Sequence, residues 1–364
     1  MGCSETAYAG NREYLRDFNA KSARLHVPLS GSLDLTNRCN LRCVHCYAGA
    51  HTSDMTVAEM DTGKILSLLD EISEAGCLYL LITGGEPLIR KDFPEIYRYA
   101  KGKGLLITLF TNGTLISDSI IQLFKELPPR VVEISLYGAT QQTYEGITGV
   151  KGSYEKCLSG IRRLLEHNIN VRLKTILMTL NSHEFSDIEK TAKEFGVKFR
   201  FDAALFPRLN GDRTPLELRV SASDAVNKEF SDQERAALWE KFLGTHRDKS
   251  FSDDLYQCGA GITGFYIAPQ GSLRPCLMTT LISYNLLKGS FSDGWKEIRS
   301  QIRQKKTARN FTCTTCDKIL FCDYCPAFFE LENGNSHLRS EYLCTMSNHR
   351  YENVRKTGGT QDAK

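Results

Sequence analysis

The chain has 364 residues, with 46 lysines and arginines against 43 aspartates and glutamates, so its formal net charge is only +3. A charge this close to balance gives no electrostatic reason to expect nucleic acid or a membrane surface as a partner. No apolar run reaches the roughly 18 residues that a membrane-spanning helix needs, and the first 20 residues are polar and unlike a signal peptide. We therefore expect a cytoplasmic protein that buries one large or two modest cores.

Thirteen cysteines in a chain without a signal peptide favour metal binding over disulfides. Ten of the thirteen fall into ordered clusters, and Cys3, Cys77 and Cys157 are left over. Cys77 begins an apolar run and Cys157 lies in a helix-like stretch, so we interpret both as small core residues.

Residues 1–28 form a polar extension, with a short helix expected over 13–24. From residue 29 onward, apolar runs typical of buried strands alternate with longer stretches of helical periodicity. The expected strands are 33–36, 78–83, 105–111, 131–136, 171–178 and 197–202. The expected helices are 56–75, 92–102, 117–126, 140–146 with 153–167, and 183–195.

Six strand–helix units in succession predict an α/β fold with a parallel sheet and its helices outside. Right-handed crossovers curl such a sheet toward a barrel. Since six units are fewer than the eight of a closed barrel, we expect a partial (β/α)6 TIM-like barrel. The expected divisions of the chain are an N-terminal extension 1–28, the barrel 29–205, a bridging segment 206–256, a cysteine-rich domain 257–348 and a tail 349–364.

The bridging segment begins with a loop, 206–215, that is rich in turn residues and arginine, and a polar helical stretch with Trp239 follows. We expect it to cross the mouth of the barrel. Arg208 and Arg213 could pair with substrate carboxylates there, although solvation at the surface explains them equally simply.

The first cysteine loop, Cys39-x3-Cys43-x2-Cys46, directly follows the first expected strand. Three thiolates can hold three irons of a 4Fe–4S cube, which leaves the fourth iron free to bind an amine or a carboxylate. His45 could in principle be a fourth ligand or contact a cofactor, but it lies inside the same tight loop. The alternative is a zinc-binding or free-thiol loop.

Polar residues follow the other expected strands, and the carboxyl ends of barrel strands are where such folds carry out their chemistry. Thr83 is followed by Gly84-Gly85-Glu86-Pro87, and glycines there let the backbone come close to a ligand. Asn112 and Ser135 could bind a ribose or a carboxylate, or could cap a turn or helix. Asp202 ends the last strand and could accept a proton, or cap the start of the bridging segment.

A second field of cysteines begins at position 258 and supplies seven thiols. They are Cys258, Cys276, Cys313, Cys316, Cys322, Cys325 and Cys344. Seven thiols could make two metal sites, one closed by four ligands and one held by three. Two zinc knuckles are the alternative, because Cys-x2-Cys pairs are common zinc ligands.

The cysteine loop at 39–46 and the Thr-Gly-Gly-Glu-Pro segment at 83–87 together resemble the motifs of radical S-adenosylmethionine (SAM) enzymes. In that family the open iron chelates SAM, and an electron from the cluster cleaves SAM to a 5′-deoxyadenosyl radical. The resemblance implies that Gly84, Gly85, Glu86 and Pro87 contact the methionine amino group of SAM.

The same resemblance favours Ser135 for a contact with the ribose or carboxylate of SAM, together with Asn112. Many relatives carry an aspartate where this chain has Tyr137, which leaves the ribose contact open at one position. The family has an open six-stranded barrel, in agreement with the count of strand–helix units.

The second field of cysteines resembles the SPASM extension of radical SAM enzymes, which carries two auxiliary iron–sulfur clusters. The usual pattern ends Cys-x2-Cys-x5-Cys-x3-Cys, whereas the last gap here is two residues. The resemblance implies one complete cluster and one with an open or non-cysteine fourth site. The first set is Cys313, Cys316, Cys322 and Cys344, and the second is Cys258, Cys276 and Cys325.

Three 4Fe–4S clusters with SAM as a consumed co-substrate suit a net oxidation of the substrate. The resemblance implies a maturase that crosslinks, forms a thioether in, or decarboxylates a ribosomally made peptide or protein. It would need a low-potential electron donor of the flavodoxin or ferredoxin type. Because the chain is too short for a fused leader-recognition domain, we expect a small separate leader-binding protein or direct docking.

Two alternatives remain open at this point. Similar enzymes modify tetrapyrrole side chains in haem-type pathways, and the arginines of the bridging segment would suit carboxylates. The other alternative is a non-catalytic module that binds zinc or a cluster.

Overall fold

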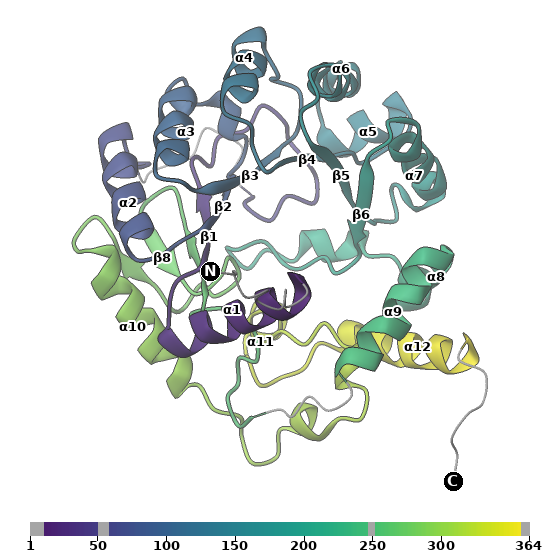
Figure 1. Cartoon of the computed structure of the whole chain (residues 1–364). Coiled ribbons are helices and arrows are strands. Elements are labelled where there is room, and N and C mark those ends of the chain that lie inside the picture. The colour runs from purple at the N-terminus through teal and green to yellow at the C-terminus, as the bar shows by residue number, and fades with distance from the viewer. Residues whose placement is uncertain (1–10, 50–57, 247–251, 358–364) are drawn as a thin grey trace, which may run out of the picture.

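The computed structural model describes residues 11–49, 58–246 and 252–357 of the chain. Within these ranges the strands form one sheet in the order β6-β5-β4-β3-β2-β1-β7-β8-β9. The first six strands of the chain lie next to one another in chain order. Together they curve into an open barrel (Figure 1). These parallel strands are β1 (Ser30–Asp34), β2 (Tyr79–Thr83), β3 (Leu106–Thr111), β4 (Val131–Ser135), β5 (Val171–Ile176) and β6 (Lys198–Asp202).

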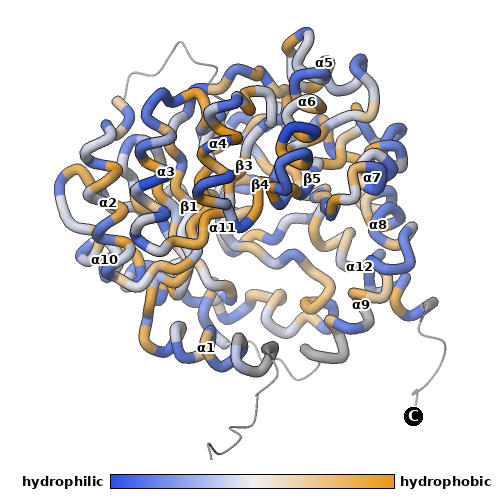
Figure 2. Tube along the Cα trace, turned by 45° about the horizontal axis from the view of Figure 1, so that its top comes forward, coloured by the Kyte–Doolittle hydropathy of each residue, from blue (hydrophilic) through white to orange (hydrophobic). Residues whose placement is uncertain are grey.

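Helices cover the outer face of the barrel, as Figure 1 shows. They are α2 (Thr62–Glu74), α3 (Phe93–Gly102), α4 (Asp118–Glu126), α5 (Gln141–Thr148), α6 (Ser153–Glu166) and α7 (Phe185–Glu194). Each has one apolar face; that of α2, with Ile65, Leu68 and Ile72, is completely buried. Figure 2 shows hydrophobic residues along the strands near β1 and β3, and alternating character along the surrounding helices. The expected partial (β/α)6 barrel is confirmed.

Strands β2 to β6 lie within two residues of their predicted bounds, but the first strand and the first barrel helix differ. The strand expected at 33–36 is Ser30–Asp34, because the polar run at 30–32 pairs with β2 on one side and with β7 on the other. The helix expected from residue 56 begins at Thr62, because the Asp61 carboxylate accepts a hydrogen bond from the Lys64 backbone N–H at 2.8 Å and caps it.

The C-terminal region extends the barrel sheet beyond its first strand. Strand β7 (Gly264–Ile267) pairs parallel to β1, and β8 (Ser272–Arg274) and β9 (Tyr284–Asn285) continue the sheet antiparallel. A Cβ on Gly31 of β1 would lie 2.2 Å from Cζ of Phe265, so only glycine lets this ring lie against the strand. Helix α10 (Phe291–Gln304) packs its Phe291 and Trp295 rings on Phe265.

The remaining helices lie at the open side of the barrel (Figure 1). They are α1 (Asn11–Leu25), α8 (Ala222–Phe230), α9 (Gln233–His246), α11 (Pro326–Asn333) and α12 (Glu341–Thr357), with short 3-10 turns at Pro87–Ile89, Ser182–Glu184, Thr214–Leu218, Thr312–Thr315 and Ile319–Phe321. The buried Arg350 of α12 bonds Glu229 of α8 at 2.6 Å and Asp323 at 2.8 Å, which ties the bridging segment to the cysteine-rich region. None of the described helices is both long and apolar enough to cross a membrane.

Candidate active site

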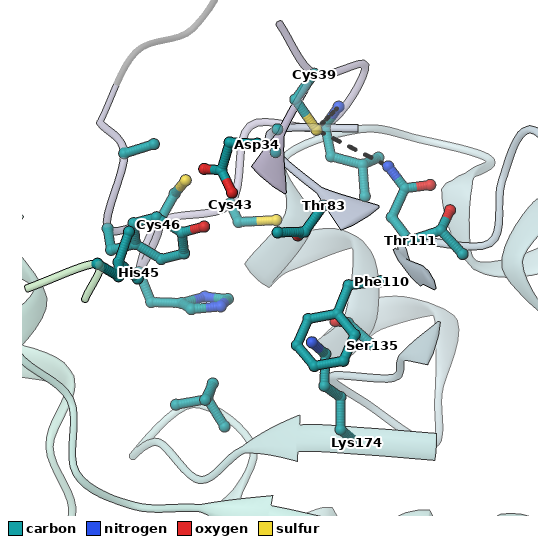
Figure 3. A pocket seen from close by; sticks show the side chains of 18 of the residues that line it. Asp34, Cys39, Cys43, His45, Cys46, Thr83, Phe110, Thr111, Ser135 and Lys174 are labelled. Carbon is teal, nitrogen blue, oxygen red and sulfur yellow. Dashed lines mark hydrogen bonds between the residues drawn. The ribbon is translucent and has the colours of Figure 1, made fainter. Parts of the chain in front are cut away.

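A cavity of about 320 Å³ lies where the barrel strands end. It is lined by the last residue of all six parallel strands: Asp34, Thr83, Thr111, Ser135, Ile176 and Asp202. The thiols of Cys39, Cys43 and Cys46 line the same cavity, and Figure 3 shows them on one side of it, with Phe110 and Lys174 on the other. The barrel therefore brings its strand ends and the first cysteine loop to one site.

The three thiols of this loop are close enough to influence one another electrostatically. Burial, followed by the charges of Cys46 and Cys39, raises the pKa of Cys43, and burial raises that of Cys39 to about 11. Thiolates in such a place need a nearby positive charge, which iron supplies. The Cys39 sulfur accepts hydrogen bonds from the Leu41 backbone N–H (3.4 Å) and from Nδ2 of Asn112 (3.8 Å), and N–H···S bonds of this kind are typical of cluster ligands.

The donor set therefore fits an iron–sulfur cluster, which spreads its thiolate ligands over several irons. Among the described residues, no three His, Cys, Asp or Glu side chains are grouped closely enough to hold a single metal ion. All twelve cysteines of the described ranges are free thiols; Cys77 and Cys157 are buried as expected, and Cys3 lies outside those ranges.

His45 lies buried in the wall of the cavity, with its ring edge-on to Tyr137 at 4.5 Å between centroids. Burial lowers the pKa of this imidazole to about 4, so it is neutral at physiological pH. Its Nδ1 has no hydrogen-bond partner within the described ranges. A contact between His45 and a cofactor stays a prediction.

Gly84 and Gly85 line the cavity and also pack against the backbone that leads into the cysteine loop. A Cβ on Gly84 would lie 2.4 Å from the Thr36 carbonyl oxygen, and one on Gly85 would lie 2.4 Å from that of Arg38. Gly84 has a φ of +142°, which other residues rarely adopt. The glycines are thus needed for the fit of two chain segments, a reason that the sequence alone did not reveal.

Glu86 is fully buried, and its carboxylate is occupied by the protein itself. It accepts hydrogen bonds from the Thr111 hydroxyl (2.8 Å), the Asn112 backbone N–H (2.8 Å) and the Leu88 backbone N–H (3.1 Å). Burial raises its pKa to about 7 against these bonds. Glu86 thereby fastens β3 to the 83–87 segment, and Pro87 begins the 3-10 turn that follows; their contacts with SAM stay predictions.

The other predicted site residues also line the cavity, and two of them have structural partners. The side chain of Asn112 donates to Oδ1 of Asn40 at 2.9 Å and accepts from the Thr114 backbone N–H. Oδ1 of Asp202 accepts from the Ala204 backbone N–H at 2.8 Å, which is the capping role considered above. Burial raises the pKa of Asp202, so a proton can reside on it more readily.

Sequence reasoning missed three charged residues that line this cavity, Asp34, Lys174 and Arg200, and the first two face it from opposite strands. Oδ2 of Asp34 accepts from the Tyr266 hydroxyl at 2.8 Å, and Oδ1 has no partner in the described part of the chain. Burial raises the pKa of Asp34 to about 7. A charge in the short apolar run at 33–36 was a signal that could have identified Asp34, whereas Lys174 shares its strand with Arg172 and did not stand out.

A second cavity, of about 640 Å³, adjoins the first on the far side of the barrel interior. Both cavities are lined by Ser32, Leu81, Phe110, Tyr266 and Leu277. Cys258 and Cys276 line the second one, so thiols from both cysteine fields face the interior of the barrel from its two ends. Cys325 is close enough to Cys276 and Cys258 for their charges to raise its pKa, after the larger effect of burial.

The other four C-terminal thiols gather around a separate cavity of about 330 Å³. Its lining includes Cys313, Cys316, Cys322 and Cys344. Burial and the charge of Cys344 raise the pKa of Cys313 to about 11 and that of Cys322 to about 12. The structure therefore brings together the same two sets of thiols that the resemblance paired.

We compared the sequence with models of known families and with characterised proteins. Residues 33–195 match the model of the radical SAM superfamily. The "AdoMet-dependent heme synthase" of Methanosarcina barkeri is 27% identical over 88% of this chain and 97% of its own length. The Bacillus subtilis "Antilisterial bacteriocin subtilosin biosynthesis protein AlbA" is 25% identical over 90% of this chain and 73% of its own.

Solved structures share the fold at low sequence identity. "Native anSMEcpe with bound AdoMet" has a TM-score of 0.73 at 16% identity and covers 91% of this chain and 98% of its own. Streptococcus suis SuiB bound to precursor peptide SuiA has a TM-score of 0.69 at 16% identity, covering 94% and 84%. Residues 33–195 thus match a radical SAM domain, and over most of its length the chain is similar to enzymes of this superfamily, SPASM-type members among them.

Proposed function

We propose that this enzyme reductively cleaves SAM to a 5′-deoxyadenosyl radical and uses it to oxidise a peptide or protein substrate. The observation that carries the proposal is the single cavity into which three thiols and the ends of six strands converge. Cys39, Cys43 and Cys46 would hold a 4Fe–4S cluster, which supplies the electron for cleavage and an open iron for SAM. Gly84 to Pro87, Asn112, Ser135 and His45 would surround SAM.

The protein's own part in this chemistry is to hold a substrate C–H bond near the cleaved SAM and to exclude water. After losing a hydrogen atom, the substrate radical must lose one electron and one proton to give an oxidised product. Asp202 would accept the proton, since it faces the cavity and its pKa is raised. Cys258 and Cys276, at the adjoining cavity, lie on the route by which the electron would leave.

We further propose two auxiliary 4Fe–4S clusters. Cys313, Cys316, Cys322 and Cys344 would close one of them, and Cys258, Cys276 and Cys325 would hold the other, with a fourth site open to water or substrate. The mutual electrostatic effects within each set support this division. Iron–sulfur clusters need reduced thiols, which supports a cytoplasmic location, and a flavodoxin or ferredoxin would supply the electron.

A peptide substrate is supported by the similarity to AlbA, a bacteriocin biosynthesis protein, over most of this chain. The fold shared with SuiB, whose structure holds a precursor peptide, shows that such an architecture admits one. A crosslink, a thioether or a decarboxylation would be the product, and a small separate protein could present the leader of the precursor.

The second candidate is oxidative modification of a tetrapyrrole side chain, which the similarity to a heme synthase over 97% of that protein's length favours. Of the arginines in the bridging segment, Arg208 bonds Asp212 at 2.5 Å and Arg219 bonds Glu332 at 2.9 Å, while Arg213 donates to the Glu332 carbonyl. Further cations for such carboxylates lie in the barrel interior.

The proposal is tested with anaerobically purified protein, reconstituted with iron and sulfide, reduced with dithionite and given SAM. We expect 5′-deoxyadenosine, and a precursor peptide encoded beside the gene that loses hydrogen, or hydrogen together with carbon dioxide if it is decarboxylated. Cys77→Ala, at a buried cysteine outside both fields, is the matched control and should retain activity. An unchanged precursor together with decarboxylated iron coproporphyrin III would favour the second candidate, and absence of 5′-deoxyadenosine would contradict both.

A further inference from the structure

The interior of the barrel carries more positive than negative side chains on strands β4 to β6. The strand register places Ser135, Lys174 and Arg200 side by side in one row across these three strands. Glu133, two residues before Ser135 and buried, faces the same interior. Its carboxylate accepts a hydrogen bond from Nε of Arg200. Glu133 is therefore already paired with Arg200 and not with Lys174.

Lys174 has an aromatic ring as its close neighbour, and no described carboxylate lies within ion-pair distance of it. Its Nζ lies 3.1 Å from the centre of the Phe110 ring, and the Arg200 guanidinium lies 5.7 Å from the same centre. Figure 3 shows the Lys174 side chain rising from β5 toward Phe110 and Ser135. No hydrogen bond or ion pair of Lys174 is found in the described part of the chain. A ring face balances only part of the charge of a desolvated ammonium group.

Two further arginines extend this positive region into the adjoining cavity. Arg172 lies two residues before Lys174 and so faces the same side of β5, beside Glu133 in the strand register. Arg130, just before β4, lines the same cavity with its guanidinium 5.6 Å from the centre of the Tyr79 ring. Neither forms an ion pair with a described residue. This region thus holds two carboxylates, Glu133 and Asp202, against four cations.

We propose that Lys174, with Arg172 and Arg130 beyond it, binds carboxylate groups of the substrate inside the barrel. Lys174 shares its cavity with Cys43, so the carboxylate that it binds lies beside the reacting part of the substrate. Arg172 and Arg130 bind a second carboxylate in the adjoining cavity, where the guanidinium fork suits bidentate bonding. The inference rests on the proposed function and deepens it, because it names the substrate as an anion with at least two carboxylates.

Such carboxylates occur on an acidic peptide and on an iron porphyrin with propionate side chains. In both cases the carboxylate supplies the counter-ion that Lys174 lacks, and its burial against Phe110 excludes water from the ion pair. The carboxylate of SAM is a competing occupant, since SAM is expected in the same cavity. The experiment therefore measures substrate probes and SAM separately.

The test compares the reconstituted wild-type enzyme with Lys174→Met, with Lys174→Arg, and with Lys125→Met, a change at an exposed lysine on α4. The probes are iron coproporphyrin III and its tetra-amide, followed by visible absorbance, and a glutamate-rich hexapeptide and its glutamine counterpart, followed by calorimetry. We expect the wild type to bind one acid at least tenfold more tightly than its amide. Lys174→Met should abolish this preference, while Lys174→Arg and Lys125→Met should keep it.

The pair of probes that shows the preference identifies whether the carboxylates belong to a porphyrin or a peptide. The proposal is overturned if the wild type binds acid and amide alike, or if Lys174→Met weakens both equally. It is also overturned if Lys174→Met lowers the affinity for SAM, because Lys174 would then bind the SAM carboxylate. Formation of 5′-deoxyadenosine without substrate reports on the proposed function independently and should be the same in the wild type and in Lys125→Met.

Discussion

The first cysteine loop and the last four cysteines line cavities of nearly equal size, about 320 and 330 Å³, but with very different walls. The first has three thiols and the polar ends of six strands. The second has four thiols, and its other walls come from 3-10 turns and α12, without any residue of the barrel strands. The same residue type thus lines a cavity inside the barrel in one place and a cavity outside it in the other. By the proposed function the first holds a cluster with one iron open and the second a fully liganded cluster, so we call them the open site and the closed site.

The cations beside the two sites differ in the same way. At the second cavity, Lys318 donates to Oδ1 of Asn348 at 2.8 Å and Arg339 bonds Glu341 at 3.1 Å. At the first, Lys174 lies over the Phe110 ring and forms no ion pair or hydrogen bond with any residue that the structure describes. Protein groups satisfy the charges around the closed site, whereas the open site keeps a charge for a molecule that is not part of the chain.

The largest expected effect is on SAM cleavage when a thiol of the open site is removed. Cys43→Ala should reduce 5′-deoxyadenosine to the level formed without enzyme, because two thiolates do not hold the cube with one iron free. Iron analysis should show a loss of about four of about twelve irons per chain. Retention of SAM cleavage by this variant would show that the chemistry does not take place at the first loop.

The complementary change is Cys344→Ala at the closed site. It should also remove about four irons, but should leave 5′-deoxyadenosine formation without substrate within about twofold of wild type, since Cys344 lies outside the barrel cavity. Formation of the oxidised product should fall much more, because the electron has lost its way out. If both variants lose SAM cleavage equally, the two sites do not have separate roles.

The sequence alone predicted those features of the two sites that short segments encode, such as apolar strands and closely spaced cysteines. Strands β2 to β6 could be placed because parallel strands buried on both faces read as continuous apolar runs. The start of β1 could not, since the polar residues 30–32 form a strand through pairing with β2 and with β7, both distant along the chain. The cysteines stood out by their spacing, and the resemblance supplied their grouping.

Residues whose role depends on their surroundings could not be predicted in the same way. Glu86 was assigned to SAM by resemblance, which stays a prediction, and the structure adds that its carboxylate accepts hydrogen bonds from Thr111 and Asn112. Arg208 seemed available for a substrate until the fold placed Asp212 beside it. Lys174, in contrast, was not singled out from the sequence. Only the strand register with Ser135 and Arg200 shows that it lies in the interior.

The fit between the 83–87 segment and the cysteine loop sets the shape of the open site, and Gly85→Ala tests it. The added Cβ would lie 2.4 Å from a backbone oxygen, so we expect the free energy of unfolding to fall by about 1–3 kcal/mol. Gly102→Ala, at a glycine with no atom within 4 Å of an added Cβ, is the matched control and should be neutral or slightly stabilising. Equal effects in chemical denaturation would show that this contact does not constrain the loop.

The smallest effect concerns the unbalanced charge of the open site, and it depends on pH. Burial lowers the pKa of Lys174 to about 7, with Arg200 adding to this and Glu133 opposing it. Between pH 7 and about 10.5 the unfolded chain therefore binds more protons at this position than the folded one, and the stability of the wild type rises with pH across this window. Lys174→Met removes the cost of burying the charge, so it should stabilise the protein by about 1 kcal/mol below pH 7 and by less as the pH approaches 10.5.

Lys318→Met, at the closed site, should bring no such gain because its ammonium group is already bonded to Asn348. Unfolding free energies at pH 6.5 and pH 9.5 decide the matter: a gain that does not shrink with pH would mean that the methionine acts through packing, and that Lys174 does not hold an uncompensated charge for a ligand.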